Sequence, residues 1–418
     1  MPALNSDVKF REVWAWSMYD FANSGYTTVV ITAVFSAYFV SVVAGNAPWA
    51  TFAWTAALSV SYALVLLTGP LVGAWADAHA AKKKLLVYST IGCVLFTALL
   101  YFASPGAVAL ALALIVFSNY FYGVGENVIA AFLPELADSD AMGRVSGWGW
   151  AFGYLGGLAA LGICLVYILS TNQPAAVTVP VSMLITAAFF VACATPTFVF
   201  LGERAKPQPQ SGKPLARVMQ TLRQTRQYKD LGRFLLCILF YQAGVSAVVA
   251  LAAIYAEQAM KFTTQQTIQL ILVVNVTAAI GAFGFGYLQD AIGHVRAIAL
   301  TLVGWLVMIG IAYFASTAAT FWIAANLAGL CMGSSQAAGR ALVGYLAPPA
   351  RLAEFFGLWG FAVKAASIFG PLTYGAVTWM FAGNHRLGIL TVGAYFVVGL
   401  ALLAGVDVAR GRASALAR

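Results

Sequence analysis

Two stretches of the sequence echo each other: GPLVGAWADAHAAKKK at residues 69–84 and GAFGFGYLQDAIGHVR at residues 281–296. Each places a glycine four residues before an aspartate, Gly73 before Asp77 and Gly286 before Asp290, at the same offset along the chain. A long apolar run precedes each stretch, and basic residues follow it. The repeat predicts a duplicated chain whose two halves fold alike, as parallel repeats do in many membrane transporters.

Composition places this duplicated chain in a membrane. Of its 418 residues, 61% are hydrophobic and only 9% are charged, whereas soluble domains carry about 25% charged residues. Apolar runs of about 20 residues or more, long enough to cross a bilayer, recur throughout. We predict an all-α membrane protein with twelve transmembrane helices, at about 14–44, 53–79, 84–103, 107–136, 145–170, 179–202, 231–257, 266–291, 296–315, 319–347, 354–381 and 387–408. A β-barrel would show alternating segments of about ten residues, which this sequence lacks.

The basic residues orient the spans. With the N-terminus inside, nearly all lysines and arginines fall in cytoplasmic loops and tails, and the opposite side holds only Lys261 and Arg386. This bias predicts both termini in the cytoplasm. Binding to nucleic acid, the other interpretation of a net charge of +9, is disfavoured because the basic residues cluster at helix ends.

The longest loop divides the chain into two predicted six-helix halves, residues 1–202 and 231–418. The first part of this loop, residues 203–230, is rich in proline and reads as a linker. Its second part places Leu215, Met219 and Leu222 on one helical face, which suits an amphipathic helix on the membrane surface. A solvated run of charges is the alternative.

The duplicated G-x-x-x-D turn resembles the cytoplasmic signature of the major facilitator superfamily, although Ala80 stands where a second glycine is usual and the second copy keeps Gly293. Three longer strings, YDFANSGYTTVVITAVF, FLPELA…GRVSGWGWAFGYLGG and QAAGRALVGYLAP…AEFFGLWGFAVKAASIFGP, are similar to the vacuole-effluxer-like branch of that superfamily. The resemblance implies the major facilitator fold, with two pseudo-symmetric halves around a central cavity. It also implies export of small solutes, amino acids being the best-known class.

Glycines recur every four residues in GWGWAFGYLGG, residues 147–157, as Gly149, Gly153 and Gly157. This spacing is typical of transmembrane helices that approach closely. A phosphate-binding loop is the alternative, but no strand precedes the motif. The family resemblance places this span at the interface between the halves.

Polar residues at helical spacing form stripes in three of the spans, and such stripes favour a water-filled path over random core positions. The candidate pathway residues are Asp20, Asn23, Ser24 and Thr27 in span one, Asn119, Tyr122 and Glu126 in span four, Asn326, Gln336 and Arg340 in span ten, and Lys364 in span eleven. Polar contacts that only hold helices together are the alternative.

Both embedded acids, Asp20 and Glu126, belong to the N-terminal half, and both embedded bases, Arg340 and Lys364, to the C-terminal half. Opposite charges are therefore expected to face each other across the cavity. Glu126 lies eight residues before Pro134, and Arg340 lies eight residues before Pro348, both at the cytoplasmic ends of their spans. The two charges therefore lie at the same depth, and we predict that they form a pair. The alternative is that each charge pairs within its own half.

The duplicated aspartates are interpreted as latches of a cytoplasmic gate. A carboxylate binds the positive N-terminal end of a helix, so Asp77 would meet span eleven near Glu354, and Asp290 would meet span five near Ser146. Helix termination by a solvated acid is the alternative. The predicted gate set is Gly73, Asp77, Gly286, Asp290, Arg144 and Glu354.

These features predict a secondary transporter, most simply an exporter of a small polar metabolite such as an amino acid, in a bacterial plasma membrane. Its partners would be membrane lipid, the small-molecule substrate and protons as a coupling ion; we expect a monomer. Three scattered histidines and five apolar-span cysteines predict no metal site and no cofactor. An uptake carrier for another solute (sugar, nucleoside or peptide) is the nearest alternative. A membrane enzyme or sensor is disfavoured because the loops are short.

Overall fold

The apolar runs form helices in the computed structural model, which describes residues 4–45, 47, 49–171, 173–205, 207, 228–262, 264–381 and 384–417. The N-terminal half contains α1 (Phe10–Tyr26), η1 (Thr27–Ala33), α2 (Phe35–Tyr38), η2 (Phe39–Val43), α3 (Ala50–His79), α4 (Lys82–Leu99), η3 (Leu100–Phe102), α5 (Val108–Ala130), α6 (Leu133–Leu136), η4 (Ser139–Ala141), α7 (Met142–Thr171) and α8 (Ala175–Phe200). The C-terminal half contains α10 (Lys229–Gln258), α11 (Thr264–Ile292), α12 (His294–Phe314), α13 (Ala318–Leu346), η5 (Pro349–Arg351), α14 (Leu352–Met380), α15 (His385–Leu403) and α16 (Val408–Leu416). The predicted amphipathic helix of the linker lies outside the described residues.

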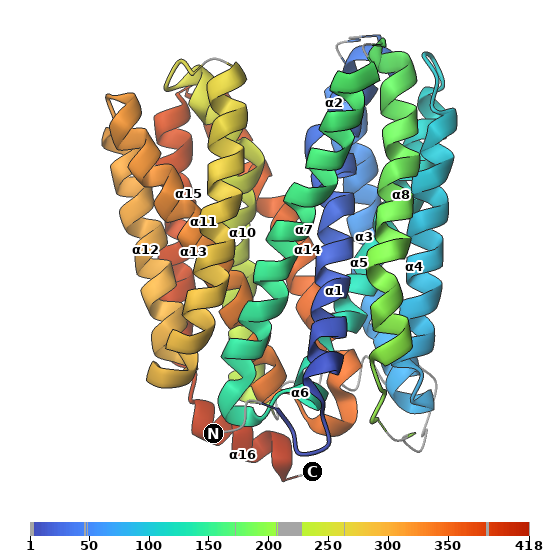
Figure 1. Cartoon of the computed structure of the whole chain (residues 1–418). Coiled ribbons are helices and arrows are strands. Elements are labelled where there is room, and N and C mark those ends of the chain that lie inside the picture. The colour runs from blue at the N-terminus through green and yellow to red at the C-terminus, as the bar shows by residue number, and fades with distance from the viewer. Residues whose placement is uncertain are drawn as a thin grey trace.

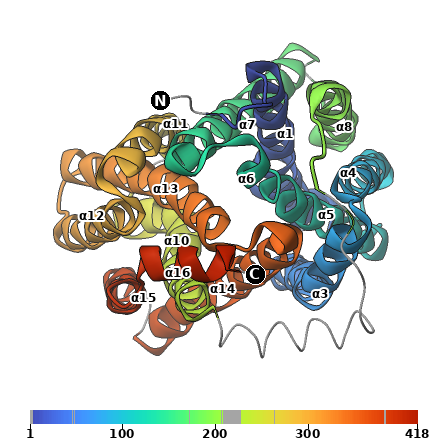
Figure 2. The same ribbon diagram turned by 90° about the horizontal axis from the view of Figure 1, so that it is seen from below.

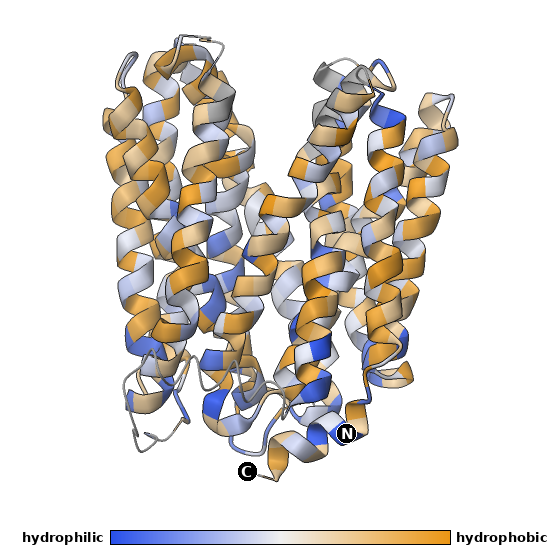
Figure 3. Cartoon of the chain, turned by 180° about the vertical axis from the view of Figure 1, so that it is seen from behind, coloured by the Kyte–Doolittle hydropathy of each residue, from blue (hydrophilic) through white to orange (hydrophobic). Residues whose placement is uncertain are grey.

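Eleven helices of the described chain are long and apolar enough to cross a membrane, the first of them running unbroken through α1, η1, α2 and η2. The twelfth, α13, has 29 residues but carries Asn326, Gln336 and Arg340 among its apolar positions. Large apolar side chains cover the outside: Leu67, Leu169 and Phe314 are 71%, 78% and 78% exposed. In Figure 3 most of the helical ribbon has the colours of hydrophobic residues, and hydrophilic residues gather mainly toward one end. Such a surface suits contact with lipid rather than water.

The two halves contact each other through equivalent helices. Helix α7 of the N-terminal half packs against α11 and α13 of the C-terminal half, and α3 packs against α14 in the same way. Because α3 and α11 are each the second span of their half, and α7 and α14 each the fifth, the two largest contacts are related by the pseudo-symmetry. The two halves stand side by side in Figure 1.

Both termini lie at one end of the molecule, and the ribbons of the two halves approach each other there and diverge toward the other end (Figure 1). We call this the basic end, because lysines and arginines follow or begin the helices there, among them Lys82, Lys83, Arg144, Arg351 and Arg410. Seen from this end, α16 lies across the ends of other helices (Figure 2), and it contacts α10 and α13.

Close helix packing inside the N-terminal half depends on the glycines of α7. A side chain at Gly153 would meet Ser24, and one at Gly156 would overlap the backbone of Phe21, both on α1. Gly157 likewise faces Ser24 and Thr28. The expected place of this span at the interface between the halves is confirmed, because α7 packs against α11 and α13 and Gly149 faces Arg340. Gly153, Gly156 and Gly157 instead let α7 approach the first span of the same half.

We expect Gly156→Ala to destabilise the protein by about 1–3 kcal/mol, because the added methyl group must displace the backbone of α1. Gly162→Ala, on the same helix, is the matched control because no atom lies within 4 Å of its added methyl group. Thermal unfolding in detergent measures both. An equal melting temperature for the two variants would show that the close approach is not stabilising.

Candidate functional site

The embedded charges form two ion pairs, and each pair joins one half of the molecule to the other. In the first pair, Arg340 of α13 donates from Nη1 to Asp20 Oδ2 of α1 over 2.6 Å. The side chains are 3% and 12% exposed. A charge this deeply buried is costly unless it is paired, so the halves are held together where these residues meet.

Serine and tryptophan side chains position the guanidinium of Arg340. Arg340 Nε donates to Ser146 Oγ over 3.1 Å, and Nη2 donates to the Ser146 carbonyl over 2.8 Å. The guanidinium carbon also lies 4.7 Å from the ring centre of Trp16 and 5.4 Å from that of Trp150. The hydrogen bonds occupy the edges of the planar guanidinium, and the tryptophan rings lie against its faces. Together these contacts orient the guanidinium toward α1.

The second pair lies between α5 and α14. Lys364 Nζ donates to Glu126 Oε2 over 2.8 Å, and the side chains are 9% and 18% exposed. The rings of Tyr62 and Tyr122 lie 5.5 and 5.3 Å from the ammonium nitrogen. The ammonium group therefore has one carboxylate and two aromatic faces as partners.

The predicted pair of Glu126 with Arg340 is wrong, and so is the alternative that each charge pairs within its own half. The two residues were matched by depth along their helices, but depth does not determine lateral position. Helix α14 packs against α3 and α5, which brings Lys364 to Glu126. Helix α13 packs against α7, whose Ser146 turns Arg340 toward Asp20.

The other candidate pathway residues divide into two groups. Tyr122 belongs to the Lys364 cluster and stacks on Tyr26 with ring centres 5.3 Å apart, while the amide of Asn119 donates to Ser61 Oγ over 2.5 Å. Asn23 is buried, and its Oδ1 atom has no hydrogen-bond partner in the described part of the chain.

The remaining four do not join these clusters. Ser24 faces the glycines of α7, Thr27 Oγ1 donates to the Ser24 carbonyl over 3.1 Å, and Asn326 donates over 2.8 Å to the carbonyl of Trp322 in its own helix. Gln336 is half-buried on α13. Helical spacing alone did not separate residues that face the partner half from those that face their own.

Sequence reasoning missed the neutral residues that surround the charges: Trp16, Tyr62, Ser146 as a ligand of Arg340, and Trp150. Aromatic residues are frequent throughout this chain, 14% of it, so their presence in a span carries no signal. Only the location of the charges in three dimensions identifies them.

The aspartates of the repeated motif each bind the N-terminus of a helix in the opposite half. Asp77 Oδ1 accepts from the backbone N–H of Ala353 over 3.2 Å, and Oδ2 from that of Glu354 over 2.9 Å, in the first turn of α14. Glu354 is fully buried and accepts from Arg351 Nε and Nη2 over 2.8 and 2.9 Å. A carboxylate at this place is stabilised by the unpaired N–H groups and the helix dipole.

Asp290 repeats this arrangement at the start of α7. Its Oδ1 and Oδ2 atoms accept from the backbone N–H groups of Gly143 and Arg144 over 2.9 and 3.1 Å, and Arg144 Nε lies 3.3 Å from Oδ2. The contact thus falls on Gly143 and Arg144, one turn before the expected Ser146, which binds Arg340 instead.

The glycine of each motif lies one turn before the aspartate and lets the helices approach. A side chain at Gly73 would overlap the backbone of Ala353, and one at Gly286 would press on the backbone of Gly143 and Arg144. A turn follows the aspartate of the second motif, and Gly293 lies in it with φ +89°. Residues with a side chain rarely adopt such a φ, which explains the second glycine of the motif. Ala80, at the equivalent position, also has a positive φ but takes the left-handed helical conformation (φ 47°, ψ 53°), whereas Gly293 has ψ 154°. The left-handed conformation costs a residue with a side chain about 1–2 kcal/mol.

Twelve membrane-length helices in the described chain, in two pseudo-symmetric halves joined by paired charges inside the bundle, are the architecture of a membrane transporter of the major facilitator type. The model of the family described as vacuole effluxer Atg22 like matches residues 50–416, and the chain belongs to this family.

Similar proteins are bacterial, fungal and human. The chain is 30% identical over 407 residues to the MFS-type transporter YxiO of Bacillus subtilis, covering 94% of each protein. It is 25% identical over 305 residues to autophagy-related protein 22-1 of Penicillium rubens, covering 66% of this chain and 50% of that protein, so it spans about half the length of the fungal relative. Among solved structures, the human organic anion transporter MFSD10 shares the fold with a TM-score of 0.72 at 16% identity, covering 94% of this chain and 99% of that one.

We expect Asp77→Asn and Asp290→Asn each to favour a form that is open at the basic end. Each aspartate contacts the helix dipole only when the basic end is closed. Removing its charge therefore destabilises the closed form alone, by about 0.3–2 kcal/mol. The measurement is maleimide labelling of Ala341→Cys, a fully buried position on α13 that packs into the core of the N-terminal half, with the five native cysteines replaced. Asp140→Asn, an exposed acid at the same end, is the control. Labelling unchanged by both latch variants would exclude the latch.

A double-mutant cycle should identify the partner of Arg340. With the same labelling equilibrium as readout, Asp20→Asn and Arg340→Gln are expected to couple by about 1–3 kcal/mol. Glu126→Gln and Arg340→Gln are expected to be additive within about 0.5 kcal/mol. Stronger coupling of Arg340 to Glu126 than to Asp20 would contradict the pairing described above.

Proposed function

We propose that this protein is a secondary active transporter that exports a small zwitterion, an amino acid being the simplest example, by alternating access. The proposal is carried by one observation: two buried ion pairs, Asp20–Arg340 and Glu126–Lys364, each span the two halves. The relatives described as vacuole effluxers support export of a small solute.

Each ion pair offers a place where a substrate group can substitute for a protein group. A substrate carboxylate replaces Asp20 as partner of the Arg340 guanidinium, and a substrate ammonium replaces Lys364 between Glu126, Tyr62 and Tyr122. The two exchanges release Asp20 and Lys364, which carry opposite charges. A zwitterion therefore adds no net charge to the site, a singly charged substrate does, and a neutral substrate gains neither charged contact. A zwitterion is therefore the substrate class that this arrangement favours.

The distribution of basic residues supports an orientation with the basic end in the cytoplasm. The Asp77 and Asp290 contacts then close the cytoplasmic side. In the proposed cycle both contacts break together, since the pseudo-symmetry relates them, and the halves tilt to expose the site to the cytoplasm. By analogy with the bacterial relative, the membrane is the plasma membrane of a bacterium.

Reconstitution into liposomes tests the proposal. Purified protein is expected to exchange a radiolabelled amino acid against the same amino acid trapped inside, and Arg340→Gln is expected to lower this exchange by about tenfold or more. Labelled sugars and nucleosides serve as comparison substrates. Exchange of these neutral solutes without exchange of any amino acid would overturn the assigned substrate class.

We further propose that Glu126 couples transport to protons. When Lys364 leaves Glu126, a proton can take the place of the ammonium as the partner of the carboxylate. Glu126→Gln is expected to abolish accumulation driven by a pH gradient and to lower exchange only in part, because glutamine mimics the protonated acid but lacks the charge that pairs with the substrate ammonium. Asp20→Asn is the parallel variant. Gradient-driven accumulation that survives in both variants would exclude protons taken up at these two carboxylates.

A further inference from the structure

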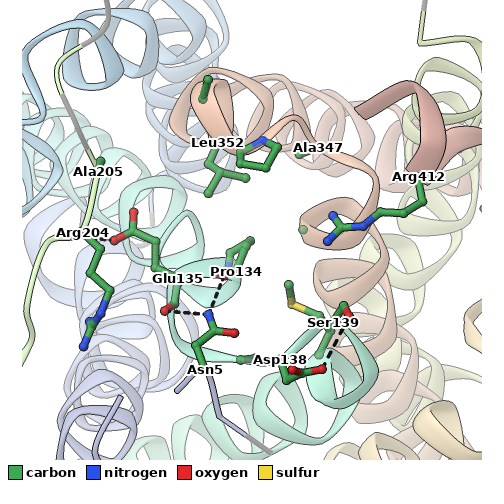
Figure 4. Close-up of a pocket in the computed structure, with 15 residues that line it drawn as sticks. Asn5, Pro134, Glu135, Asp138, Ser139, Arg204, Ala205, Ala347, Leu352 and Arg412 are labelled. Carbon is green, nitrogen blue, oxygen red and sulfur yellow. Dashed lines mark hydrogen bonds between the residues drawn. The ribbon is translucent and has the colours of Figure 1, made fainter. Parts of the chain in front are cut away.

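A cavity of about 560 Å³ lies at the basic end, between the two halves (Figure 4). Its N-terminal wall includes Asn5, Glu135, Asp138 and Arg204, and its C-terminal wall includes Leu352 and Arg412. A volume of about 300–1,000 Å³ with a few polar groups is typical of small-molecule sites. This cavity is separate from the ion pairs Asp20–Arg340 and Glu126–Lys364, none of which lines it.

Two of the four charged residues in its wall already have partners of opposite charge. Glu135 binds the buried ammonium of Lys82, and its Oε2 atom accepts from the backbone N–H of Arg204 over 2.8 Å. The guanidinium of Arg204 lies 2.7 Å from Asp7 and 3.0 Å from Glu12. The hydrogen bond from Arg204 holds the pKa of Asp7 below its usual value. These residues build the wall and have no charge left to offer a ligand.

The other two, Asp138 and Arg412, have no salt bridge in the described part of the chain. Asp138 Oδ1 accepts from the backbone N–H of Asp140 over 3.0 Å, and its Oδ2 atom has no hydrogen-bond partner among the described residues. Arg412 Nη1 donates to the Tyr345 carbonyl over 2.8 Å, and its guanidinium carbon lies 4.7 Å from the Tyr345 ring centre, so the charge itself is not neutralised. Both side chains are half-buried. Figure 4 shows both residues at the cavity, where they come from opposite halves.

We propose that this cavity is a second binding site for a zwitterion, with Asp138 receiving the ammonium group and Arg412 the carboxylate. An anion alone would be repelled by Asp138, and a cation alone by Arg412, so a ligand with both charges is favoured. The choice of ligand rests on the proposed function, since an exporter meets its substrate first at the cytoplasmic end. An amino acid and a short peptide share this chemistry.

A ligand held by both walls binds best when the walls are close together. Occupancy therefore stabilises the form that is closed at the basic end, in proportion to the difference in affinity between the two forms. The site would thus slow re-opening toward the cytoplasm when the zwitterion is abundant there, and so regulate the transport cycle.

The test is equilibrium binding to the full-length protein purified in detergent, in an Arg340→Gln background that removes the group proposed to bind the substrate carboxylate at the central site. The probes are labelled L-alanine, L-lysine, L-glutamate and L-alanyl-L-alanine, with propylamine and propionate as ligands that carry a single charge. We expect one equivalent of at least one zwitterionic probe to bind. Asp138→Asn and Arg412→Gln should each weaken it by about tenfold or more, since each removes a charged hydrogen-bond partner.

Asp140→Asn and Arg296→Gln are the matched controls, because both change an exposed charge near the same end that does not line the cavity. If Arg340→Gln is not monodisperse, Glu126→Gln, which removes the carboxylate proposed to receive the substrate ammonium, provides the background. Binding that is equal in all four variants, or no binding of any zwitterionic probe, overturns this inference. Equally tight binding of propylamine or propionate overturns the zwitterion assignment. These outcomes are separate from the liposome exchange assay, whose failure would overturn the proposed function instead.

Discussion

A charge inside a membrane protein has to be paired, and the structure of this transporter depends on how that requirement is met. Each half on its own would leave unpaired charges inside the bundle, acids in the N-terminal half and bases in the C-terminal half. The pairs Asp20–Arg340 and Glu126–Lys364 satisfy both halves at once. Because a buried pair is costly to break and close to neutral to keep, these contacts contribute more to the choice between conformations than to overall stability.

The contacts at the basic end use a different physical device. Asp77 and Asp290 bind backbone N–H groups at the first turns of α14 and α7, which are charged only through the peptide dipoles. Such a contact is weaker than a buried ion pair and can form only when the glycine one turn earlier allows the backbones to meet. A pair of moderate, symmetry-related contacts suits a gate that has to open in every cycle.

The neutral residues around the ion pairs determine how the charges are presented. Ser146 and two tryptophans occupy the edges and faces of Arg340, while two tyrosines flank Lys364. The guanidinium is held rigidly, whereas the ammonium is a point charge that can move between its carboxylate and the aromatic rings. The two pairs are therefore unequal: Arg340 has more hydrogen bonds that fix its orientation than Lys364 has.

Much of this architecture is determined by the sequence alone. Local composition and periodicity are enough to identify the apolar runs of membrane length, the repeated G-x-x-x-D turn and the division of acids and bases between the halves. The bilayer imposes these features on each segment separately, because its thickness and low polarity act on every span. Which residues pair could not be obtained this way: Glu126 and Arg340 lie at similar depth, yet α13 faces α7 and α14 faces α5, so each binds another partner. Gly153, Gly156 and Gly157 of α7 likewise pack on the first span, whereas Gly147 and Gly149 meet the other half. Depth is a property of one helix, whereas partner choice depends on how twelve helices are arranged laterally, and only their packing in three dimensions decides that.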